Sequence, residues 1–187
     1  MIYSLKIKYL NNLHINKEIY DDKIKNIDTI CKTKYDYFIL NGNIGNPFEI
    51  YYENFLKYCF ENIDSKNIFI IGGDFEYSFD TYENINNKIQ NIIDNINKHS
   101  NKIIFFEKKC IFFRNISFIG CSLIKNDSEK ENLIWINKNI TNSIKKYSEV
   151  CLITFNESEK SADFENILIY NVNSKKKDSD LSITLYN

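Results

Sequence analysis

Four short segments, each following an apolar strand-like run, constrain the fold of this chain more than any other feature. All are polar or contain glycine, and in chain order they are Asn11-Asn12-Leu13-His14, Asn41-Gly42-Asn43-Ile44-Gly45, Gly73-Asp74-Phe75-Glu76-Tyr77 and Thr154-Phe155-Asn156. Short apolar runs that stop at turn signals are typical of buried strands. Because sites in open α/β sheets gather where loops leave the carboxyl ends of strands, we expect the four segments to lie together.

Strand-like and helix-like periods alternate along the rest of the chain. Strands are expected at 5–10, 37–40, 67–71, 102–106, 110–113, 116–121, 149–154, 167–172 and 181–186, and helices at 17–33, 48–63, 80–99 and 128–147. The helix expected at 80–99 carries the clearest apolar stripe. The turn Arg114-Asn115 predicts a hairpin between its flanking strands. The alternation predicts an α/β fold with short parallel strands inside and helices outside.

Length and charge narrow the class of protein. A chain of 187 residues suits a single domain spanning residues 1–187. The formal net charge is −1 and Arg114 is the only arginine, which disfavours a nucleic-acid partner because arginine supplies most bidentate contacts to phosphates and bases. Asn, Lys, Ile, Tyr and Phe are abundant, and their AT-rich codons indicate an AT-rich genome. An isolated Asn or Lys therefore carries little functional weight.

The cysteines and the amino terminus indicate the compartment. The chain has five cysteines, widely spaced and without a CxxC pair: Cys31, Cys59, Cys110, Cys121 and Cys151. All except Cys110 lie in or beside apolar segments, which suits buried, reduced thiols. The amino terminus lacks the apolar region of a signal peptide, and no apolar run approaches the roughly 18 residues that span a bilayer. We expect a cytoplasmic protein in a reducing compartment, with no membrane span.

In the order and spacing of its strand-end segments, the chain resembles the calcineurin-like metallophosphoesterase family. The family's signatures are DxH, GD, GNH[ED], a Thr-His or Gly-His step and GHxH, each after a strand. Here they read Asn12-Leu13-His14, Gly42-Asn43, Gly73-Asp74-Phe75-Glu76, Thr154-Phe155 and, in the weakest match, residues 169–174. The resemblance covers nearly the whole chain. It implies a four-layer α/β/β/α sandwich in which the strands ending at residues 10, 40, 71 and 154 cluster at one end.

The same resemblance assigns most of the family's ligand positions to residues that bind metals poorly. The family's first Asp and its bridging Asp correspond to amides, and two of its histidines correspond to phenylalanines, whereas one histidine keeps its identity. In chain order the family positions are Asn12, His14, Asn43, Asp74, Phe75 and Phe155. A two-metal phosphoesterase needs carboxylates and imidazoles around both cations. We therefore expect no metal, no other cofactor and no catalytic residue at these positions.

The substitutions also make structural sense as a set. Replacing Asp by Asn keeps the shape and removes a charge that would repel its neighbours in the absence of cations. Phe75 and Phe155 would fill space that ions and water otherwise occupy. For His14, a hydrogen bond to Asn43 or Asp74 is favoured over metal binding. For Asp74 and Glu76, stabilisation of the loop is favoured over binding of a cation.

The resulting prediction is a catalytically inactive protein that acts as a binding, scaffold or structural component, through a protein partner or self-association. The branch of the family that contains the small retromer subunit is similar in its Gly-Asn and GDF sequences and gives a precedent for a scaffold role. Two alternatives stay open: a phosphoesterase with a divergent, weakened metal site, and a non-hydrolytic binder of a nucleotide or phosphorylated ligand. The candidate binding residues near the loop end are Tyr51, Tyr52, Tyr77 and Phe79.

Overall fold

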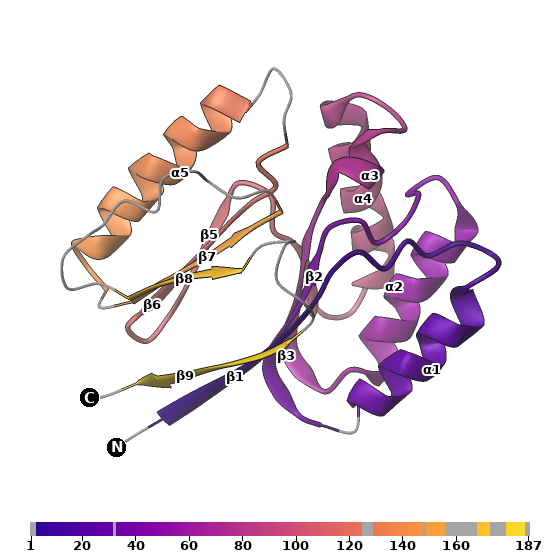
Figure 1. The fold of residues 1–187 in the computed structure, drawn as a ribbon, viewed down its shortest axis with the longest axis horizontal. Coiled ribbons are helices and arrows are strands. Elements are labelled where there is room, and N and C mark those ends of the chain that lie inside the picture. Colours follow the sequence, from indigo (N-terminus) through magenta and orange to yellow (C-terminus); the bar gives the residue numbers. More distant parts are fainter. Residues whose placement is uncertain are drawn as a thin grey trace.

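The computed structural model describes residues 3–31, 33–124, 129–147, 149–155, 168–172 and 179–185 (Figure 1). The strands are β1 (Tyr3–Leu10), β2 (Tyr35–Asn41), β3 (Ser65–Ile71), β4 (Ile103–Phe105), β5 (Lys109–Phe113), β6 (Ile116–Cys121), β7 (Glu149–Thr154), β8 (Leu168–Val172) and β9 (Ser179–Leu185). The helices are α1 (Tyr20–Cys31), α2 (Ile50–Asn62), α3 (Asp74–Tyr77), α4 (Tyr82–Ile96) and α5 (Glu129–Ile144).

The strands form two sheets. The first has the order β4-β3-β2-β1-β9, in which β1 to β4 are parallel and β9 runs antiparallel to β1. The second has the order β5-β6-β7-β8, in which β6, β7 and β8 are parallel. Strands β5 and β6 pair antiparallel up to Phe113 and Ile116, so the hairpin predicted at Arg114-Asn115 is confirmed.

Side chains of alternating residues on the strands divide the interior into layers. On β2, Phe38 and Leu40 belong to the core between the first sheet and helices α1, α2 and α4, whereas Tyr37 and Ile39 face the second sheet. A third group of apolar side chains packs α5 against the outer face of the second sheet. Figure 1 shows the helices on the two outer faces. The four-layer α/β/β/α sandwich expected from the sequence is confirmed.

Some boundaries differ from the sequence-based expectation. The helix expected at 17–33 begins only at Tyr20, and the helix expected at 80–99 spans Tyr82–Ile96 after an N-cap at Thr81, whose side chain accepts from the Asn84 N–H. The short helix α3 was not expected, because four residues give no readable periodicity. Of the two polar loops expected at 157–165 and 174–180, the first lies outside the described residues, and the second overlaps β9, which begins at Ser179.

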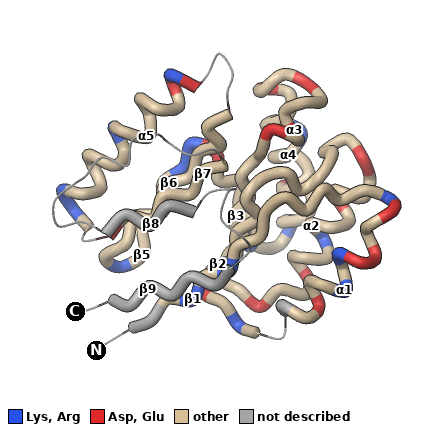
Figure 2. The backbone as a smooth tube through the Cα atoms, viewed as in Figure 1, with Lys and Arg blue, Asp and Glu red and all other residues tan. Residues whose placement is uncertain are grey.

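The described residues show how charge is distributed over the surface and where the cysteines lie. Acidic and basic residues are interspersed along α1 and α2, in keeping with the near-neutral net charge (Figure 2). The thiols of Cys59, Cys121 and Cys151 are buried and that of Cys110 is half-buried, whereas the side chain of Cys31 lies outside the described residues. No helix in the described part of the chain combines the length and the apolar character that a membrane span requires.

Candidate functional site at the strand ends

The loops after β1, β2 and β3 meet at one end of the first sheet. The backbone N–H groups of Asn12 and His14 donate to the carbonyls of Gly42 and Asn43, at 3.2 and 2.8 Å. The loop after β7 joins them, because the side-chain amide of Asn41 donates to the Thr154 carbonyl at 3.0 Å. The expected gathering of the four segments at the carboxyl ends of their strands is confirmed.

Three asparagine or histidine residues in these loops have left-handed backbones. The φ angles are 52° at Asn12, 49° at His14 and 51° at Asn43, and the neighbouring Gly42 has φ of 77°. Asparagine tolerates this conformation better than most residues, because its short polar side chain can bond locally. The tight loops bring side chains from separate strands into contact.

Asn12 and Asn43 are joined by their side-chain amides. The Oδ1 atom of Asn43 accepts from the backbone N–H of Phe75 at 2.9 Å, so its Nδ2 group must point the other way. That Nδ2 group donates to Oδ1 of Asn12, also at 2.9 Å. Both polar atoms of the Asn43 side chain therefore have partners within the protein. This order of donors and acceptors requires an amide at position 43, because a carboxylate has no N–H to offer Asn12.

Glu76 is the buried carboxylate that holds the loops in place. It has no exposed surface and accepts from the backbone N–H groups of Asn43, Ile44, Gly45 and Gly73 at 2.8, 2.5, 3.1 and 2.9 Å. Burial raises the pKa of the Glu76 carboxyl to about 7, against the opposing effect of these N–H donors. The contact with Gly73 also caps α3. The predicted loop-stabilising role is confirmed for Glu76.

Phe155 fills the space between the loops. Its side chain is 4% exposed and its ring lies against Gly42 and Gly73. A Cβ atom at Gly42 would lie 2.2 Å from the ring's Cδ2, and one at Gly73 would lie 2.8 Å from its Cε2. Only glycine at both positions leaves room for the ring. The ring thus closes the core between the two sheets at the loop end.

His14, Phe75 and Phe79 form a row of aromatic rings at the surface. The ring of the exposed His14 contacts Phe75 edge-on with centroids 5.0 Å apart, and Phe75 contacts Phe79 in the same way at 5.0 Å. The hydrogen bond from His14 to Asn43 is made by the His14 backbone. Asp74 is exposed at the start of α3, and Phe75 is half-buried. Phe75 therefore covers the site less completely than Phe155 does.

The four aromatic residues predicted to bind a partner have different surroundings. Tyr52 is fully buried, so the expectation that it presents its ring on the surface is wrong: it lies on the inward face of α2 with Phe55. Tyr51 is half-buried against Tyr20. Tyr77 is half-buried as well, and its hydroxyl donates to Oδ1 of Asn86 at 2.6 Å.

Phe79 is the member of that predicted group with the most exposed ring, at 42%. Two further exposed apolar side chains, Phe48 and Ile50, were missed by the sequence analysis. The sequence contains a signal that could have found them. Both follow Pro47, where the chain enters α2, and both precede Tyr52, the first buried residue of the helix.

The side chains that could donate to a metal at this site are few. Over the described residues, no three His, Cys, Asp or Glu side chains come together in a group that could hold a metal ion. Asp74 and His14 are the remaining candidates among the family positions, since the others are amides and phenyl groups. Of the fifth predicted segment, 169–172 form part of β8, and residues 173 and 174 lie outside the described residues.

Comparison with solved structures identifies the fold. TT1561 of Thermus thermophilus aligns over 85% of this chain and 72% of its own length, with a TM-score of 0.56 and 12% identity. Vps29 of Chaetomium thermophilum aligns over 89% and 70% of the two chains, with a TM-score of 0.41 and 13% identity. GAP50, the anchor in the inner membrane complex of Plasmodium, aligns over 87% and 58%, with a TM-score of 0.49 and 10% identity.

No protein-family model matches the chain, and no curated protein matches it either. At 12% identity, the similarity to TT1561 concerns the fold alone. The chain has a metallophosphoesterase-like α/β/β/α sandwich fold.

Proposed function

We propose that this chain is a catalytically inactive protein of the metallophosphoesterase-like fold, which acts as a binding, scaffold or structural component. The observation that carries the proposal is the hydrogen bond between the side-chain amides of Asn43 and Asn12, in the strand-end site formed by the loops after β1, β2, β3 and β7. In the family pattern these positions are carboxylates, and the one at position 43 bridges two metals. Here the Nδ2 group of Asn43 donates to Oδ1 of Asn12, and Oδ1 of Asn43 accepts from the Phe75 backbone N–H.

The carboxylates that remain nearby support the same proposal. Glu76 is fully buried, and its carboxylate oxygens accept from four backbone N–H groups of the loops, so these oxygens are already bonded within the protein. Asp74 is exposed at the start of α3 and, with His14, would leave two cations short of ligands. Hard divalent cations bind anionic oxygen or imidazole in preference to neutral amides. These residues do not fit a two-metal centre.

The packing of Phe155 also favours a role outside the strand-end site. Its ring occupies the position between Gly42 and Gly73 where a ligand histidine would act in the family pattern. A phenyl ring there contributes apolar burial and excludes water. A protein partner, or a second copy of this chain, would then be bound by the outer surface of the loops.

Metal binding and hydrolysis test the proposal directly. The purified chain should contain no stoichiometric Mn, Fe, Zn or Ni by elemental analysis. It should not hydrolyse bis-p-nitrophenyl phosphate above the buffer rate when Mn²⁺ is added. A matched variant, Asn12→Asp/Asn43→Asp, tests whether the two amides are what excludes metal: it should bind Mn²⁺ more tightly than the parent chain in calorimetry. Tightly bound metal or metal-dependent turnover in the parent chain would instead favour a weakened phosphoesterase.

A further inference from the structure

Strand β5 forms one edge of the second sheet. Among the described strands it pairs with β6 alone, and it stands at the end of the strand order. In an antiparallel ladder, alternate residues direct their N–H and C=O groups to the neighbouring strand, and the residues between them direct theirs the other way. Part of the β5 backbone is therefore turned away from β6, on the side where a further strand can be added.

The hairpin turn indicates which residues these are. The connection between β5 and β6 has two residues, and Phe113 opposite Ile116 is the pair that closes it. The closing pair of a two-residue hairpin exchanges hydrogen bonds between the strands. By alternation from Phe113, the residues that direct their backbone groups outward are Phe112 and Cys110. The outer edge thus offers the N–H and C=O groups of these two residues to an added strand.

An apolar surface accompanies this edge on the side of α5. Phe112 is 54% exposed, and its ring stacks on that of Tyr147 with centroids 4.9 Å apart and an angle of 10° between the ring planes. Tyr147 follows α5 and is half-buried. Because side chains on neighbouring strands stand next to each other, an apolar residue of an added strand would lie beside Phe112. The stacking holds the Phe112 ring in place before a partner binds, which lowers the entropy cost of binding.

The opposite face of β5 carries positive charge. Two cations lie near the Phe113 ring: the Lys66 ammonium is 4.4 Å from the ring centroid, and the Arg114 guanidinium is 5.5 Å from it. Lys109 is exposed at the start of the strand, and by alternation it lies on the same face as Phe113. From residue 109 to residue 114 the sequence contains no carboxylate. Both ends of the edge are therefore cationic.

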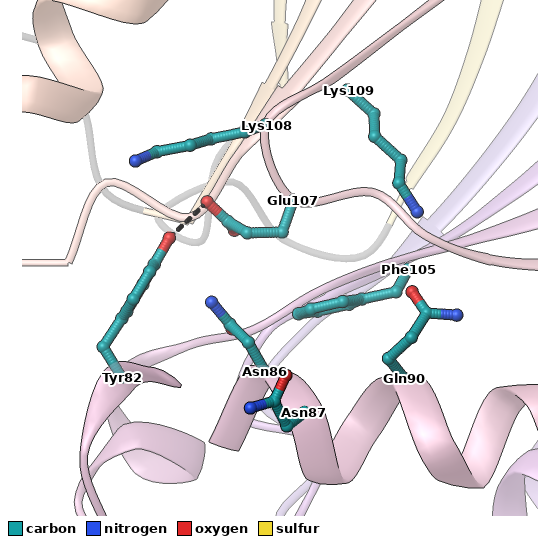
Figure 3. A pocket seen from close by; sticks show the side chains of 8 residues that line it. All are labelled: Tyr82, Asn86, Asn87, Gln90, Phe105, Glu107, Lys108 and Lys109. Atoms are coloured by element: carbon teal, nitrogen blue, oxygen red, sulfur yellow. Dashed lines mark hydrogen bonds between the residues drawn. The ribbon is translucent and has the colours of Figure 1, made fainter. Parts of the chain in front are cut away.

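Lys108, which precedes the strand, does not add to this charge. Figure 3 shows Lys109 extending toward Gln90 of α4, whereas Lys108 extends to the opposite side, where the Glu107 carboxylate lies. Lys108 also has a left-handed backbone with φ of 47°, so the extended strand begins only after it. Of the two lysines, Lys109 alone brings its charge to the edge of the sheet.

Charge also indicates which kind of strand fits this edge. A second copy of the chain would bring the same cations. In an antiparallel pairing of two β5 strands centred on Ile111, Arg114 of each copy would lie opposite Lys108 of the other, and like charges on facing residues are unfavourable. Cations on an edge strand commonly protect it against such pairing. A strand with carboxylates at both ends would instead meet Lys109 and Arg114 with the opposite charge.

We propose that β5 binds an extended segment of a protein partner, which adds a strand to the second sheet and has acidic residues at its ends and apolar residues between them. The backbone groups of Cys110 and Phe112 supply the hydrogen bonds, and the Phe112 ring supplies the apolar contact. Lys109 and Arg114 supply the charge. This surface uses none of the strand-end residues, so it does not rest on what those loops bind.

Nuclear magnetic resonance of the ¹⁵N-labelled chain tests the edge with a synthetic peptide. The probe is the acetylated and amidated peptide Glu-Glu-Val-Thr-Val-Thr-Val-Glu-Glu, and the control peptide has lysine in place of every glutamate. The acidic peptide should give saturable shifts at the backbone amides of Cys110 and Phe112 and should slow their hydrogen exchange. The lysine peptide should bind weaker by about tenfold or more, because its charges repel those of the edge.

Matched variants separate pairing at this edge from a general attraction to charge. The double variant Lys109→Gln/Arg114→Gln should weaken binding of the acidic peptide by about tenfold, and Phe112→Ala should do so by a similar factor. Lys138→Gln removes an exposed charge from α5 and should leave the affinity unchanged. The spectra themselves report whether each variant is folded, and the comparison of the two peptides needs no variant.

The same titrations contain the results that would overturn the proposal. These are the absence of saturable shifts at residues 110 and 112, equal binding of the acidic and lysine peptides, and equal affinity of the double variant and Lys138→Gln. A dilution series of the chain alone tests the other occupant. If the amides of Cys110 and Phe112 become protected as the chain concentration rises, β5 pairs with a second copy, and the acidic partner is excluded.

Discussion

The ring of Phe155 lies over Gly42 so closely that a Cβ atom at position 42 would come within 2.2 Å of the ring. Phe155 follows β7 of the second sheet, and Gly42 follows β2 of the first. Their contact therefore joins the two sheets at the loop end. Both residues belong to the segments that the sequence grouped together.

Removing the ring should weaken the whole sandwich. We expect Phe155→Ala to lower the free energy of unfolding by about 3–5 kcal/mol, because Phe155 is 4% exposed and its loss leaves a cavity. Urea denaturation measures the change. Ile134→Ala is the control: that side chain is 61% exposed on α5 and its removal should cost about 0.5 kcal/mol. Equal losses in the two variants would place Phe155 outside the core.

A double-mutant cycle should show that Gly42 and Phe155 are coupled. Gly42→Ala introduces both a clash with the ring and a left-handed alanine, at φ of 77°. In the Phe155→Ala background the clash with the ring disappears, while the backbone strain of roughly 1–2 kcal/mol and a tight 3.0 Å contact with the Gly73 Cα atom remain. The double variant should therefore lose less unfolding free energy than the sum of the losses in the two single variants. Additive losses would show that the ring moves aside without cost.

Asn43→Asp should destabilise the chain near neutral pH by roughly 1–3 kcal/mol. The new carboxylate loses the N–H that Asn12 accepts, and it is added to the residue whose backbone N–H bonds the Glu76 carboxylate. Asn12→Asp is the matched control, because an aspartate at position 12 still accepts from Asn43. Melting temperatures in EDTA compare the two variants. A larger loss for Asn12→Asp would mean that the order of donors and acceptors is reversed.

Glu76 should make stability depend on pH in a defined direction. Its folded pKa is raised from 4.5 to about 7, so the native state holds more protons than the unfolded chain between these values. The contribution of Glu76 is then largest below pH 4.5, falls as the pH rises toward 7, and is flat above that. The total change is about 3 kcal/mol.

The variant Glu76→Gln isolates this contribution because it cannot titrate in that range. The unfolding free energies of both proteins are measured from below pH 4.5, the ordinary pKa of the carboxyl, to above its raised pKa of about 7. We expect the difference, parent minus variant, to fall as the pH rises. A difference that rises with pH would show that the four backbone donors outweigh burial and hold the pKa below its ordinary value.

The sequence predicts the layers of this fold well because apolar runs and glycine positions are local signals. Phe38 to Leu40 mark a buried strand, and Gly42 after it marks a loop, without reference to other residues. The isoleucines of α4 identify its inner face in the same way. Each of these elements was therefore found at nearly its observed place.

The missed details depend on contacts between distant residues. Tyr51 and Tyr52 are adjacent and were both predicted to bind a partner, whereas packing against the core buries Tyr52. Glu76 meets N–H groups more than thirty positions away. No local pattern in the sequence reveals these hydrogen bonds.

Binding of a partner should depend on Phe79, the most exposed of the predicted binding residues at the loop end, and the last prediction concerns this residue. Phe79 is 42% exposed, and its ring contacts Phe75, which in turn contacts His14. Exposed apolar groups of this kind are where partners gain most of their binding energy. We expect Phe79→Ala to weaken self-association, or the recovery of a co-purifying protein, by about tenfold or more.

Sedimentation and quantitative mass spectrometry of co-purified proteins measure the two effects. Ile134→Ala is the matched control, since it removes an exposed apolar group from the far helix α5 and should change neither. His14→Ala tests the family position itself. It should leave binding intact, because Phe75 lies between the His14 ring and the Phe79 ring. If His14→Ala loses binding while Phe79→Ala retains it fully, the function depends on the strand-end site, and a role of the outer surface is contradicted.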